Sequence, residues 1–532
     1  MAKIAFYTLG CRSNQYETDR MARSASASGF EVVPYPGPAD IYVINTCTVT
    51  SAAEKKSRHI IRHAKKKNPG SKVIVTGCAV ERAGFGIEEI DLIVKNKDKL
   101  NIIEFIGEQR QKNRDKRLET RDQKIETRNQ GQENRDKRLE IKDKKEKAVH
   151  ANIFSNLRSP ISNLISSSPI SDPVSSSPIS DLASSSPISD LRSHPVRSNL
   201  MVEDGCENFC SYCIVPYVRG KIKSKPIDEI ISEVKQMVKD GVKEIVLTGI
   251  NLGEFKVSND QIPSAKQNSN SEFKSSPISD LPSPISDLSS PISDLSSLID
   301  TISKIDGLLR IRLSSIEPMY VTDELIKAAK ENPKVCEHFH IPLQSGDDGI
   351  LKAMNRNYTT KDFLDIAKKI REQIKDAAIT TDIIVGFPGE DEQAFKNTLK
   401  LVDKIQFSRI HIFPYSDRPG TKAQKLPHKV DPRIIVSRQE RLDKLREQLM
   451  LKFHRSFKDQ RMEILVEQRD RKTGALEGLT SNYIRVFLCA SPRANVVSRE
   501  GDDTGDESIG SLISVKFRDL QGENVIARPI LV

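Results

Sequence analysis

Short apolar runs alternate with amphipathic helical patterns through most of the chain. In residues 1–107, the runs IAFYTLG, IYVINT and VIVTG are each followed by a helical pattern. The same alternation returns at larger scale in residues 199–256 and 298–455, with helical patterns at Ile227–Asp240 and Thr360–Lys375. Regular alternation of strand and helix predicts an α/β architecture with parallel sheets. The strands predicted in the larger block are Glu244–Thr248, Arg310–Ser314, His338–Pro342, Thr381–Gly386 and Arg409–Tyr415.

The C-terminal block, residues 456–532, follows a different pattern. Apolar and polar positions alternate with a period of two in MEILVEQ, YIRVFL, LISVKF and NVIARPIL, and polar or Gly-rich turns separate these segments. Short alternating strands with such turns are typical of a small β-barrel. We therefore expect an open parallel α/β domain at the N-terminus, a second α/β domain in the middle and a small β-barrel at the C-terminus.

Two stretches show neither pattern. Residues 108–198 begin with charged heptads from Arg114 that hold at most one apolar residue each, whereas a coiled coil needs two. They continue as a Ser/Pro repeat, and residues 257–297 carry the same SPISDL unit. Such segments cannot bury enough apolar surface to offset the entropy of ordering, so we expect two disordered inserts; a docking motif in the repeats is the alternative. The predicted domains are 1–107, 199–455 interrupted by 257–297, and 456–532, with 108–198 as a linker.

Composition narrows the class of protein. Of the 532 residues, 37% are hydrophobic, a low share that agrees with a partly unfolded chain. The net charge of +10 suits a polyanionic partner such as RNA, and equally an ordinary surface with a mild basic excess. The first residues, MAKIAFYTLGCR, contain no signal-peptide core, and no apolar run reaches the roughly 18 residues that a membrane span needs. We expect a cytosolic protein with no membrane partner, whose eight cysteines serve metal binding or catalysis rather than disulfides.

Three cysteines lie close together in the segment GCENFCSYCI. Cys206, Cys210 and Cys213 have C-x3-C-x2-C spacing, which suits three irons of a [4Fe–4S] cluster and leaves the fourth iron open for a substrate. A structural zinc is the alternative, but it would need a fourth Cys or His, and none follows closely. A third interpretation, three unrelated core thiols, fits such close spacing poorly.

Three further cysteines each follow a predicted strand. Cys11 follows IAFYTLG, Cys47 follows IYVINT and Cys78 follows VIVTG. The intervals between them, 36 and 31 residues, suit βα units of about 30 residues. Because parallel strands end at one edge of the sheet, we expect the three thiols to meet there and to hold a second [4Fe–4S] cluster with one open iron. Small residues at strand ends are the alternative, which is common for one cysteine and poor for three.

The C-x3-C-x2-C motif, with Tyr212 before its last cysteine, resembles the signature of the radical S-adenosylmethionine (SAM) superfamily. This resemblance implies a partial (β/α)6 barrel, SAM bound to the open iron, and reductive cleavage of SAM to a 5′-deoxyadenosyl radical. The segments TGINLGEF, SSIEP, IPLQSG and IIVGFPGE follow the predicted strands in the order of the superfamily's SAM-contacting segments. Taken singly, the residues in them fit ordinary turn chemistry. The residues implied in SAM binding are Tyr212, Gly249, Asn251, Ser315, Glu317, Gln344, Ser345 and Gly386, with Gly389 beside the last.

The order of a cluster-bearing N-terminal domain, a radical SAM domain and a small β domain resembles the methylthiotransferase family, over nearly all of the chain outside the inserts. The resemblance implies SAM and two [4Fe–4S] clusters as cofactors, tRNA as partner, an RNA-binding TRAM domain at the C-terminus, and a flavodoxin- or ferredoxin-like electron donor. The candidate phosphate contacts, each of which is otherwise a plain surface charge, are Arg461, Arg469, Arg471, Lys472 and Arg485.

Five segments resemble the branch of this family that acts on N6-threonylcarbamoyladenosine in tRNA: TLGCRSNQYETD, LTGINLGEF, RLSSIEP, HFHIPLQSGDDGILKAMNR and HIFPYSDRPGT. The implied reaction adds a methylthio group to C2 of the adenine next to the anticodon. A radical cofactor route is required because this C–H is neither acidic nor polarised, and the base must be splayed from its neighbours to enter. The alternatives are methylthiolation of isopentenyladenosine or of a ribosomal-protein aspartate, and a non-catalytic iron–sulfur protein that binds RNA.

Overall fold

The computed structural model describes residues 1–82, 84–107, 196–257, 294–470, 473–488, 508–521 and 524–530. Every element described below lies within one compact unit, in residues 1–99 and 196–530. The two expected disordered inserts lie almost entirely outside the described residues. Among the helices within the described ranges, none is both long and apolar enough to cross a membrane.

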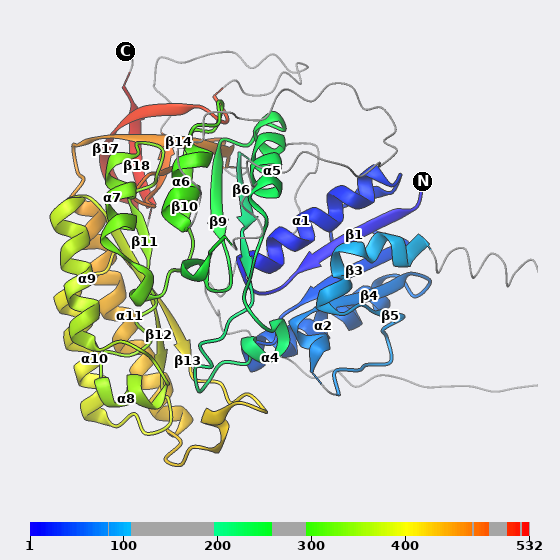
Figure 1. The fold of residues 1–532 in the computed structure, drawn as a ribbon, viewed down its shortest axis with the longest axis horizontal. Coiled ribbons are helices and arrows are strands. Elements are labelled where there is room, and N and C mark those ends of the chain that lie inside the picture. Colours follow the sequence, from blue (N-terminus) through cyan, green and yellow to red (C-terminus); the bar gives the residue numbers. More distant parts are fainter. Residues whose placement is uncertain are drawn as a thin grey trace, which may run out of the picture. The chain divides into compact units, whose positions relative to one another are not determined.

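The N-terminal domain is built on a five-stranded parallel sheet with the strand order β2-β1-β3-β4-β5 (Figure 1). Two helices contact it, α1 (Arg12–Ala27) and α2 (Ser51–Lys67), and the central strand β3 is buried along its whole length. Helix α2 begins after Thr50, whose hydroxyl accepts the N–H of Ala53. The strands are β1 (Lys3–Thr8), β2 (Glu31–Val33), β3 (Ile41–Thr46), β4 (Lys72–Gly77) and β5 (Leu92–Ile93).

The central domain holds six parallel strands in two hydrogen-bonded groups, β10-β9-β6 and β11-β12-β13. Parallel bridges from Ile311 to Val335 and from Ser315 to His340 join the two groups, which gives the partial (β/α)6 barrel that the sequence resemblance predicts. Strand β6 was not predicted, because its segment RSNLM is mostly polar. The strands are β6 (Arg197–Met201), β9 (Glu244–Thr248), β10 (Arg310–Leu313), β11 (His338–His340), β12 (Ala378–Val385) and β13 (Arg409–Pro414).

Amphipathic helices follow the strands, and their apolar faces share one large core with the sheet. Helix α10 shows how the sequence sets their limits: Asp391 accepts the N–H of Ala394 at its start, and Lys404 complements the dipole in its last turn. The helices are α4 (Val215–Arg219), α5 (Ile227–Lys239), α6 (Leu295–Ser303), α7 (Asp323–Glu331), α8 (Asp348–Ala353), α9 (Thr360–Gln373), α10 (Glu392–Ile405) and α11 (Pro432–Arg455).

Helix α6 begins inside the segment that the sequence assigns to the second insert. Asp294 forms a capping box with Ser297, and Leu295 and Leu298 are buried in the core. The last SDL triplet of the repeat therefore acts as a helix start, and residues 294–297 belong to the folded domain.

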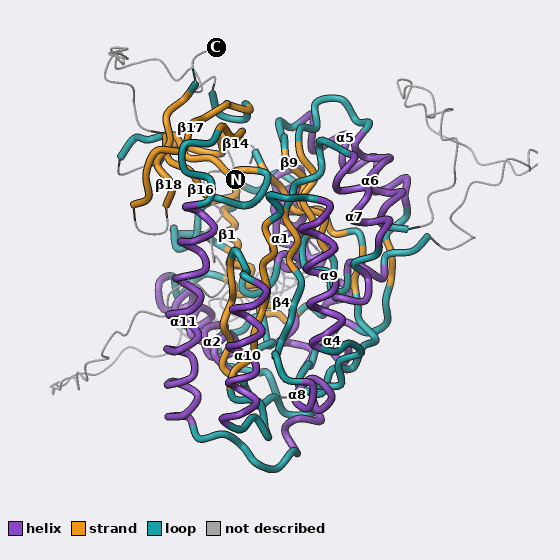
Figure 2. The backbone as a smooth tube through the Cα atoms, turned by 90° about the vertical axis from the view of Figure 1, so that its left-hand side faces the viewer, coloured by secondary structure: helices purple, strands orange, loops and turns teal. Residues whose placement is uncertain are grey.

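The C-terminal domain is a closed five-stranded barrel, β14-β15-β16-β18-β17 (Figure 2). It agrees with the predicted small β-barrel, with one strand, β15, added. Strand β15 was not predicted because its segment, LEGLT, is short and contains Gly478, a residue that weakens strands. The strands are β14 (Arg461–Arg469), β15 (Leu476–Thr480), β16 (Arg485–Leu488), β17 (Leu512–Gln521) and β18 (Asn524–Pro529).

A loop of this small barrel is fixed to the amino-terminal ends of the central strands. Arg312, which is fully buried, pairs with Glu244 and donates to the carbonyls of Thr480 and Ser481 at 3.1 and 2.9 Å. Arg310 donates to the carbonyl of Leu479. Because these guanidinium groups depend on backbone carbonyls of the small barrel, the two domains are one structural unit here.

Candidate active site

The first cysteine set lies on a single loop. Cys206 donates its N–H to the carbonyl of Gly220 at 3.1 Å, and Cys213 donates to the carbonyl of Cys210 at 2.9 Å, so a local turn holds the three thiols together. Burial raises the pKa of Cys206 to about 11 and that of Cys213 to about 12, and the charge of Cys210 acts in the same direction. Thiols that resist ionisation alone are suited to a cationic metal centre, which supplies the positive charge that stabilises thiolates.

An ion pair borders this loop. Arg356 lies 3.2 Å from the sulfur of Cys210 and 3.1 Å from a carboxylate oxygen of Glu317 through the same nitrogen. Glu317 is one of the residues that the resemblance implies in SAM binding, and it pairs with Arg356 next to the cysteine loop. A shallow cavity here is lined by Asn208, Cys210, Glu317, Met319, Asn355, Arg356 and Asn357.

The segment after β9 is packed against a buried carboxyl group. Asn251 donates its backbone N–H to Glu203 at 2.7 Å, and a Cβ atom on Gly249 would lie 2.6 Å from the same carboxylate. Burial raises the pKa of Glu203 to about 8. The side chain of Asn251 is buried, and both of its polar atoms lack a partner within the described part of the chain. Such a buried, unsatisfied amide suggests a site for a polar ligand.

The other expected SAM residues differ in their surroundings. Gln344 has a positive φ of 64° and a buried Oε1 with no partner among described residues, whereas Ser345 is buried and accepts from Asp347. Ser315 pairs with the strand end at His340. A Cβ atom on Gly386 would lie 2.4 Å from Ile435, so helix α11 already requires a glycine there. Tyr212 and Gly389 show no ligand-like feature: the ring of Tyr212 packs against Phe387, and the N–H of Gly389 donates to His428.

The second cysteine set comes together at one edge of the N-terminal sheet. Cys11, Cys47 and Cys78 directly follow the ends of the adjacent strands β1, β3 and β4, or lie within three residues of them. A Cβ atom on Gly10 would lie 2.8 Å from the sulfur of Cys47, so any larger residue at position 10 would clash with Cys47. Burial raises the pKa of Cys47 to about 12, with further contributions from the charges of Cys78 and Cys11. The three cysteines thus lie at one end of adjacent strands, and Cys47 is near enough to the other two for their charges to act on it.

One arginine, which the sequence analysis missed, connects the two sets. Helix α4 begins two residues after Cys213 and ends at Arg219, whose side chain is 1% exposed. Its guanidinium donates to Glu17 at 2.9 Å and Asn14 at 2.6 Å, both on α1, and to Asp204 at 2.8 Å. The positive charge of Arg219 also acts to lower the pKa of Cys78 against the effect of burial.

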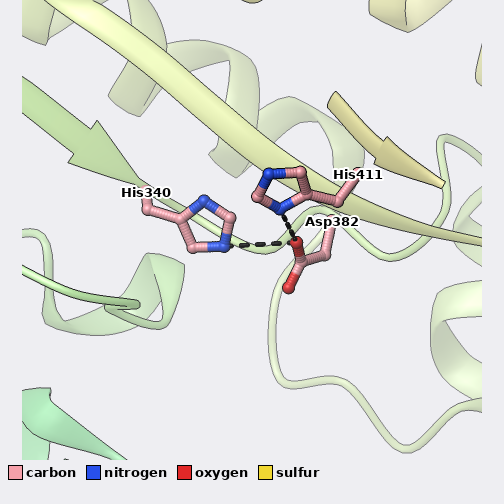
Figure 3. A group of neighbouring side chains, drawn as sticks. All are labelled: His340, Asp382 and His411. Carbon is pink, nitrogen blue, oxygen red and sulfur yellow. Dashed lines mark hydrogen bonds and ion pairs between the residues drawn. The ribbon is translucent and has the colours of Figure 1, made fainter. Parts of the chain in front are cut away.

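A polar triad lies on the central strands (Figure 3). One carboxylate oxygen of Asp382 is 3.3 Å from Nε2 of His340 and 3.0 Å from Nδ1 of His411. Burial favours the neutral acid, but the two imidazoles outweigh it and lower the pKa of Asp382. We call these three residues the His–Asp–His triad; sequence analysis did not single them out.

The candidate RNA contacts are scattered. Arg461 and Arg469 are exposed on β14, with Arg469 donating to the carbonyl of Gly474. Arg485 on β16 forms an ion pair with Glu477, which partly neutralises its charge and makes it less available to bind a phosphate. Arg471 and Lys472 lie outside the described residues.

Comparison with known proteins agrees with this layout. The model of the radical SAM superfamily matches residues 201–402, and that of uncharacterized protein family UPF0004 matches residues 3–100. The chain is similar to two proteins named threonylcarbamoyladenosine tRNA methylthiotransferase MtaB. The protein of Bacillus subtilis is 31% identical, over 97% of this chain and 94% of the relative. The protein of Thermotoga maritima is 32% identical, over 94% of this chain and 96% of the relative. A tRNA-2-methylthio-N(6)-dimethylallyladenosine synthase of Thermodesulfovibrio yellowstonii is 30% identical over 90% of each chain.

Proposed function

The chain belongs to the radical SAM methylthiotransferases, and we propose that it converts N6-threonylcarbamoyladenosine beside the anticodon of tRNA into its 2-methylthio derivative. The observation that carries the proposal is the nearly full-length similarity to enzymes named for this substrate, at 31% and 32% identity. A relative named for dimethylallyladenosine is almost as similar, so the isopentenyl-type substrate is the alternative to test.

Family membership brings SAM and [4Fe–4S] clusters as cofactors. We propose that Cys206, Cys210 and Cys213 hold one cluster and that Cys11, Cys47 and Cys78 hold the other, each leaving one iron without a protein ligand. When bound, the clusters supply the electron that cleaves SAM and the site at which the transferred sulfur is held. Within each set, the charges of neighbouring thiols oppose the ionisation of Cys47 and of Cys213, and a bound cationic cluster would offset this repulsion, which supports the assignment.

The surrounding side chains position the reactants. We propose that the unsatisfied amide groups of Asn251 and Gln344 bind polar atoms of SAM, because a buried donor or acceptor without a partner is costly unless a ligand satisfies it. Glu203 holds the backbone of the Asn251 segment, and Arg356 holds the cysteine loop through Cys210. Ser315, Glu317, Ser345, Gly386 and Tyr212 are then supporting groups around this pocket.

The macromolecular partners follow from the same assignment. We propose that the exposed arginines of β14, Arg461 and Arg469, contact tRNA phosphates, with Arg471 and Lys472 beside them in sequence and Arg485 contributing less. A flavodoxin- or ferredoxin-like protein is the proposed electron donor, since the first cysteine loop is only half-buried. Both partners are cytoplasmic, where we expect the enzyme to act.

The deciding experiment is nucleoside mass spectrometry after reaction of the reconstituted enzyme with defined tRNAs. We expect methylthiolation of tRNA that carries threonylcarbamoyladenosine, and little reaction with unmodified or isopentenylated tRNA. The Cys47→Ala variant serves as the inactive control. Equal conversion of isopentenylated tRNA would reject the substrate assignment, and product on a ribosomal protein alone would reject tRNA as the substrate. RNA binding is best tested by Arg461→Gln, because removing the whole small barrel would also strip Arg312 of its carbonyl partners.

A further inference from the structure

One face of three neighbouring strands carries polar side chains where a buried parallel barrel normally carries apolar ones. The strand registers pair His340 with Thr380 and Asp382 with His411. The opposite face of the same strands, including Phe339 and Ile383, is buried against the helices in the main core. Because alternate residues point to opposite faces, the His–Asp–His triad faces the inside of the barrel.

The triad is ordered but leaves groups for a ligand. Asp382 uses one oxygen to accept from both imidazoles, and Nδ1 of His340 is 2.9 Å from the hydroxyl of Thr380. Within the described residues, the second oxygen of Asp382 and Nε2 of His411 make no hydrogen bond. The side chains of His411 and Asp382 are 40% and 23% exposed, so the groups that remain free face open space.

The triad lies between groups assigned to the two cysteine sets. On one side, the parallel bridge from Ser315 to His340 joins the triad to the segment of Glu317, which pairs with Arg356 beside Cys210.

On the other side lies Arg12, the residue after Cys11. One of its nitrogens is 3.3 Å from the hydroxyl of Tyr483, whose ring stacks on His338 at 4.4 Å. Its other terminal nitrogen is buried without a partner among described residues. Nε2 of His338 and Nδ1 of His340 both lie 2.9 Å from the hydroxyl of Thr380, so a series of contacts joins Arg12 to the triad.

This set of free groups matches one of the two possible substrates. A threonylcarbamoyl substituent carries urea N–H groups, a hydroxyl and a carboxylate, whereas a dimethylallyl substituent carries no polar atom. The free oxygen of Asp382 and Nε2 of His411 suit the N–H and hydroxyl groups, and the unpartnered nitrogen of Arg12 suits the carboxylate. A bound substituent would exclude water from these groups, and an analogue that then leaves them unpaired is disfavoured.

We propose that the His–Asp–His triad, with Arg12, receives the N6 substituent of the target adenosine and selects threonylcarbamoyl over dimethylallyl. This inference rests on the proposed function. His411 is the specificity-determining residue, because it combines the largest exposure in the triad with an unused ring nitrogen. The separations of 3.0 and 3.3 Å would also suit neighbouring ligands of a metal ion, so metal binding is an outcome of the test.

The test compares the fully reconstituted wild type with His411→Phe on two tRNAs, one threonylcarbamoylated and one isopentenylated at the same adenosine. The readout is the ratio of kcat/KM for the two substrates, in which a general loss of activity cancels. Phenylalanine keeps a ring but removes both nitrogens, and we expect the ratio to fall by about 10-fold or more towards the isopentenylated tRNA. His411→Asn, which keeps a donor near Nδ1, retains a larger share of the preference. His59→Phe, the same change at an exposed position on α2, leaves the ratio unchanged.

The outcomes separate the inference from the proposed function. A wild type that prefers isopentenylated tRNA rejects the proposed substrate itself. A wild type that prefers threonylcarbamoylated tRNA, with an unchanged ratio in His411→Phe, overturns only the role of the triad. A stoichiometric metal beyond the cluster irons that is present in the wild type and lost in both His411→Phe and Asp382→Asn would make the triad a metal site and likewise overturn the inference.

Discussion

The two cysteine sets reach similar arrangements by different routes. Cys206, Cys210 and Cys213 lie on one loop, and hydrogen bonds within that loop bring them together. Cys11, Cys47 and Cys78 are far apart in sequence and meet only because β1, β3 and β4 are adjacent in the sheet. The first geometry is local and the second is a product of the tertiary fold, so the second set depends on everything that stabilises the sheet.

Their electrostatic surroundings differ as well. The N-terminal set lies beside buried cations: Arg219 and Lys99 both pair with Glu17, and both charges act to lower the pKa of Cys78 against the effect of burial. The segment before the first loop instead carries the buried carboxyl group of Glu203, which burial keeps largely protonated. Neighbouring cations would stabilise the thiolates and the sulfur-carrying centre proposed for the N-terminal set, whereas a protonated carboxyl adds no charge beside the proposed radical site.

The largest expected effect separates the chemical roles of the sets. Cys206→Ala abolishes formation of 5′-deoxyadenosine, whereas Cys47→Ala spares part of it and abolishes the methylthio product. Each change removes about half of the roughly eight irons that two four-iron clusters contain. Iron analysis and mass spectrometry of both products measure this. Cys336→Ala, which removes a buried thiol outside both sets, is the matched control and keeps all the iron. Methylthio product at the wild-type rate from Cys47→Ala would show that the second set has no role.

The next effect concerns the connection between the sets. Arg219→Gln removes one of the two buried cations that pair with Glu17 and leaves Lys99 as the other, so we expect a cost below the about 3–5 kcal/mol of a fully unpaired buried charge. We expect a lower unfolding temperature, and a ratio of methylthio product to 5′-deoxyadenosine that falls because α1 and Cys11 are no longer held. Calorimetry and the product ratio measure the two effects.

The matched control for this change is Arg62→Gln, which removes the pair of an exposed arginine with Glu89 and costs under about 1 kcal/mol. If Arg219→Gln keeps the wild-type product ratio, the two sets work independently of this contact.

The way in which each cysteine set forms also decides how easily it can be predicted from the sequence. Cys206, Cys210 and Cys213 can be predicted from their spacing alone, and Cys11, Cys47 and Cys78 can be predicted once each is seen to follow an apolar run. Five of the six barrel strands were predicted because each combines apolar or alternating positions with a neighbouring helical pattern. Strands β6 and β15 escaped because their segments, RSNLM and LEGLT, lack that combination.

The residues that sequence reasoning missed owe their roles to contacts across the fold. In the sequence, Arg219 is only a cation at the end of a short helical pattern. Its role becomes visible when the structure places Glu17 within hydrogen-bond distance of it. The triad comes from three strands. In the sequence, the segments HFH, TTDIIV and RIHIF each look like an ordinary alternation of polar and apolar residues. A usable signal existed, because histidine and aspartate recur at alternate positions in strands that a parallel barrel should bury on both faces. Only the strand registers show that these positions share one face.

A smaller effect tests the electrostatic difference through pH. Burial raises the pKa of Glu203 from 4.5 to about 8, so between these values the folded chain holds a proton that the unfolded chain releases. The free energy of unfolding should therefore fall as pH rises through this range, by up to roughly 1.4 kcal/mol per pH unit. Glu203→Gln removes that slope, matching the wild type near pH 5 and exceeding it near pH 8. Anaerobic thermal unfolding measures this, with the exposed Glu372→Gln as control; superimposable curves for Glu203→Gln and wild type would contradict it.

The smallest effect is expected from removing the inserts, the first of which separates the two cysteine sets in sequence. Deletion of residues 111–193 leaves α1, α4 and the Arg219 contacts intact, so cluster loading and SAM cleavage should stay near wild type. Loop closure changes by only about 0.6 kcal/mol per doubling of length, which supports the same expectation. Iron content and 5′-deoxyadenosine formation measure it. Loss of the clusters in every such deletion would mean that the linker helps to assemble the N-terminal set.

The second insert permits a sharper version of the same test, because the structure fixes where it ends. Lys256 and Asp294 form an antiparallel bridge, so the chain leaves and re-enters the fold at neighbouring points. A short Gly/Ser turn replacing residues 258–293 should therefore close without strain and keep the activity. Extending the replacement through Ser297 removes the Asp294 cap and buried Leu295, and should cost a few kcal/mol from lost capping and burial. Equal unfolding temperatures for the two replacements would place the true boundary after α6 begins, whereas loss of SAM cleavage in the shorter one would show that the insert supports the neighbouring Asn251 segment.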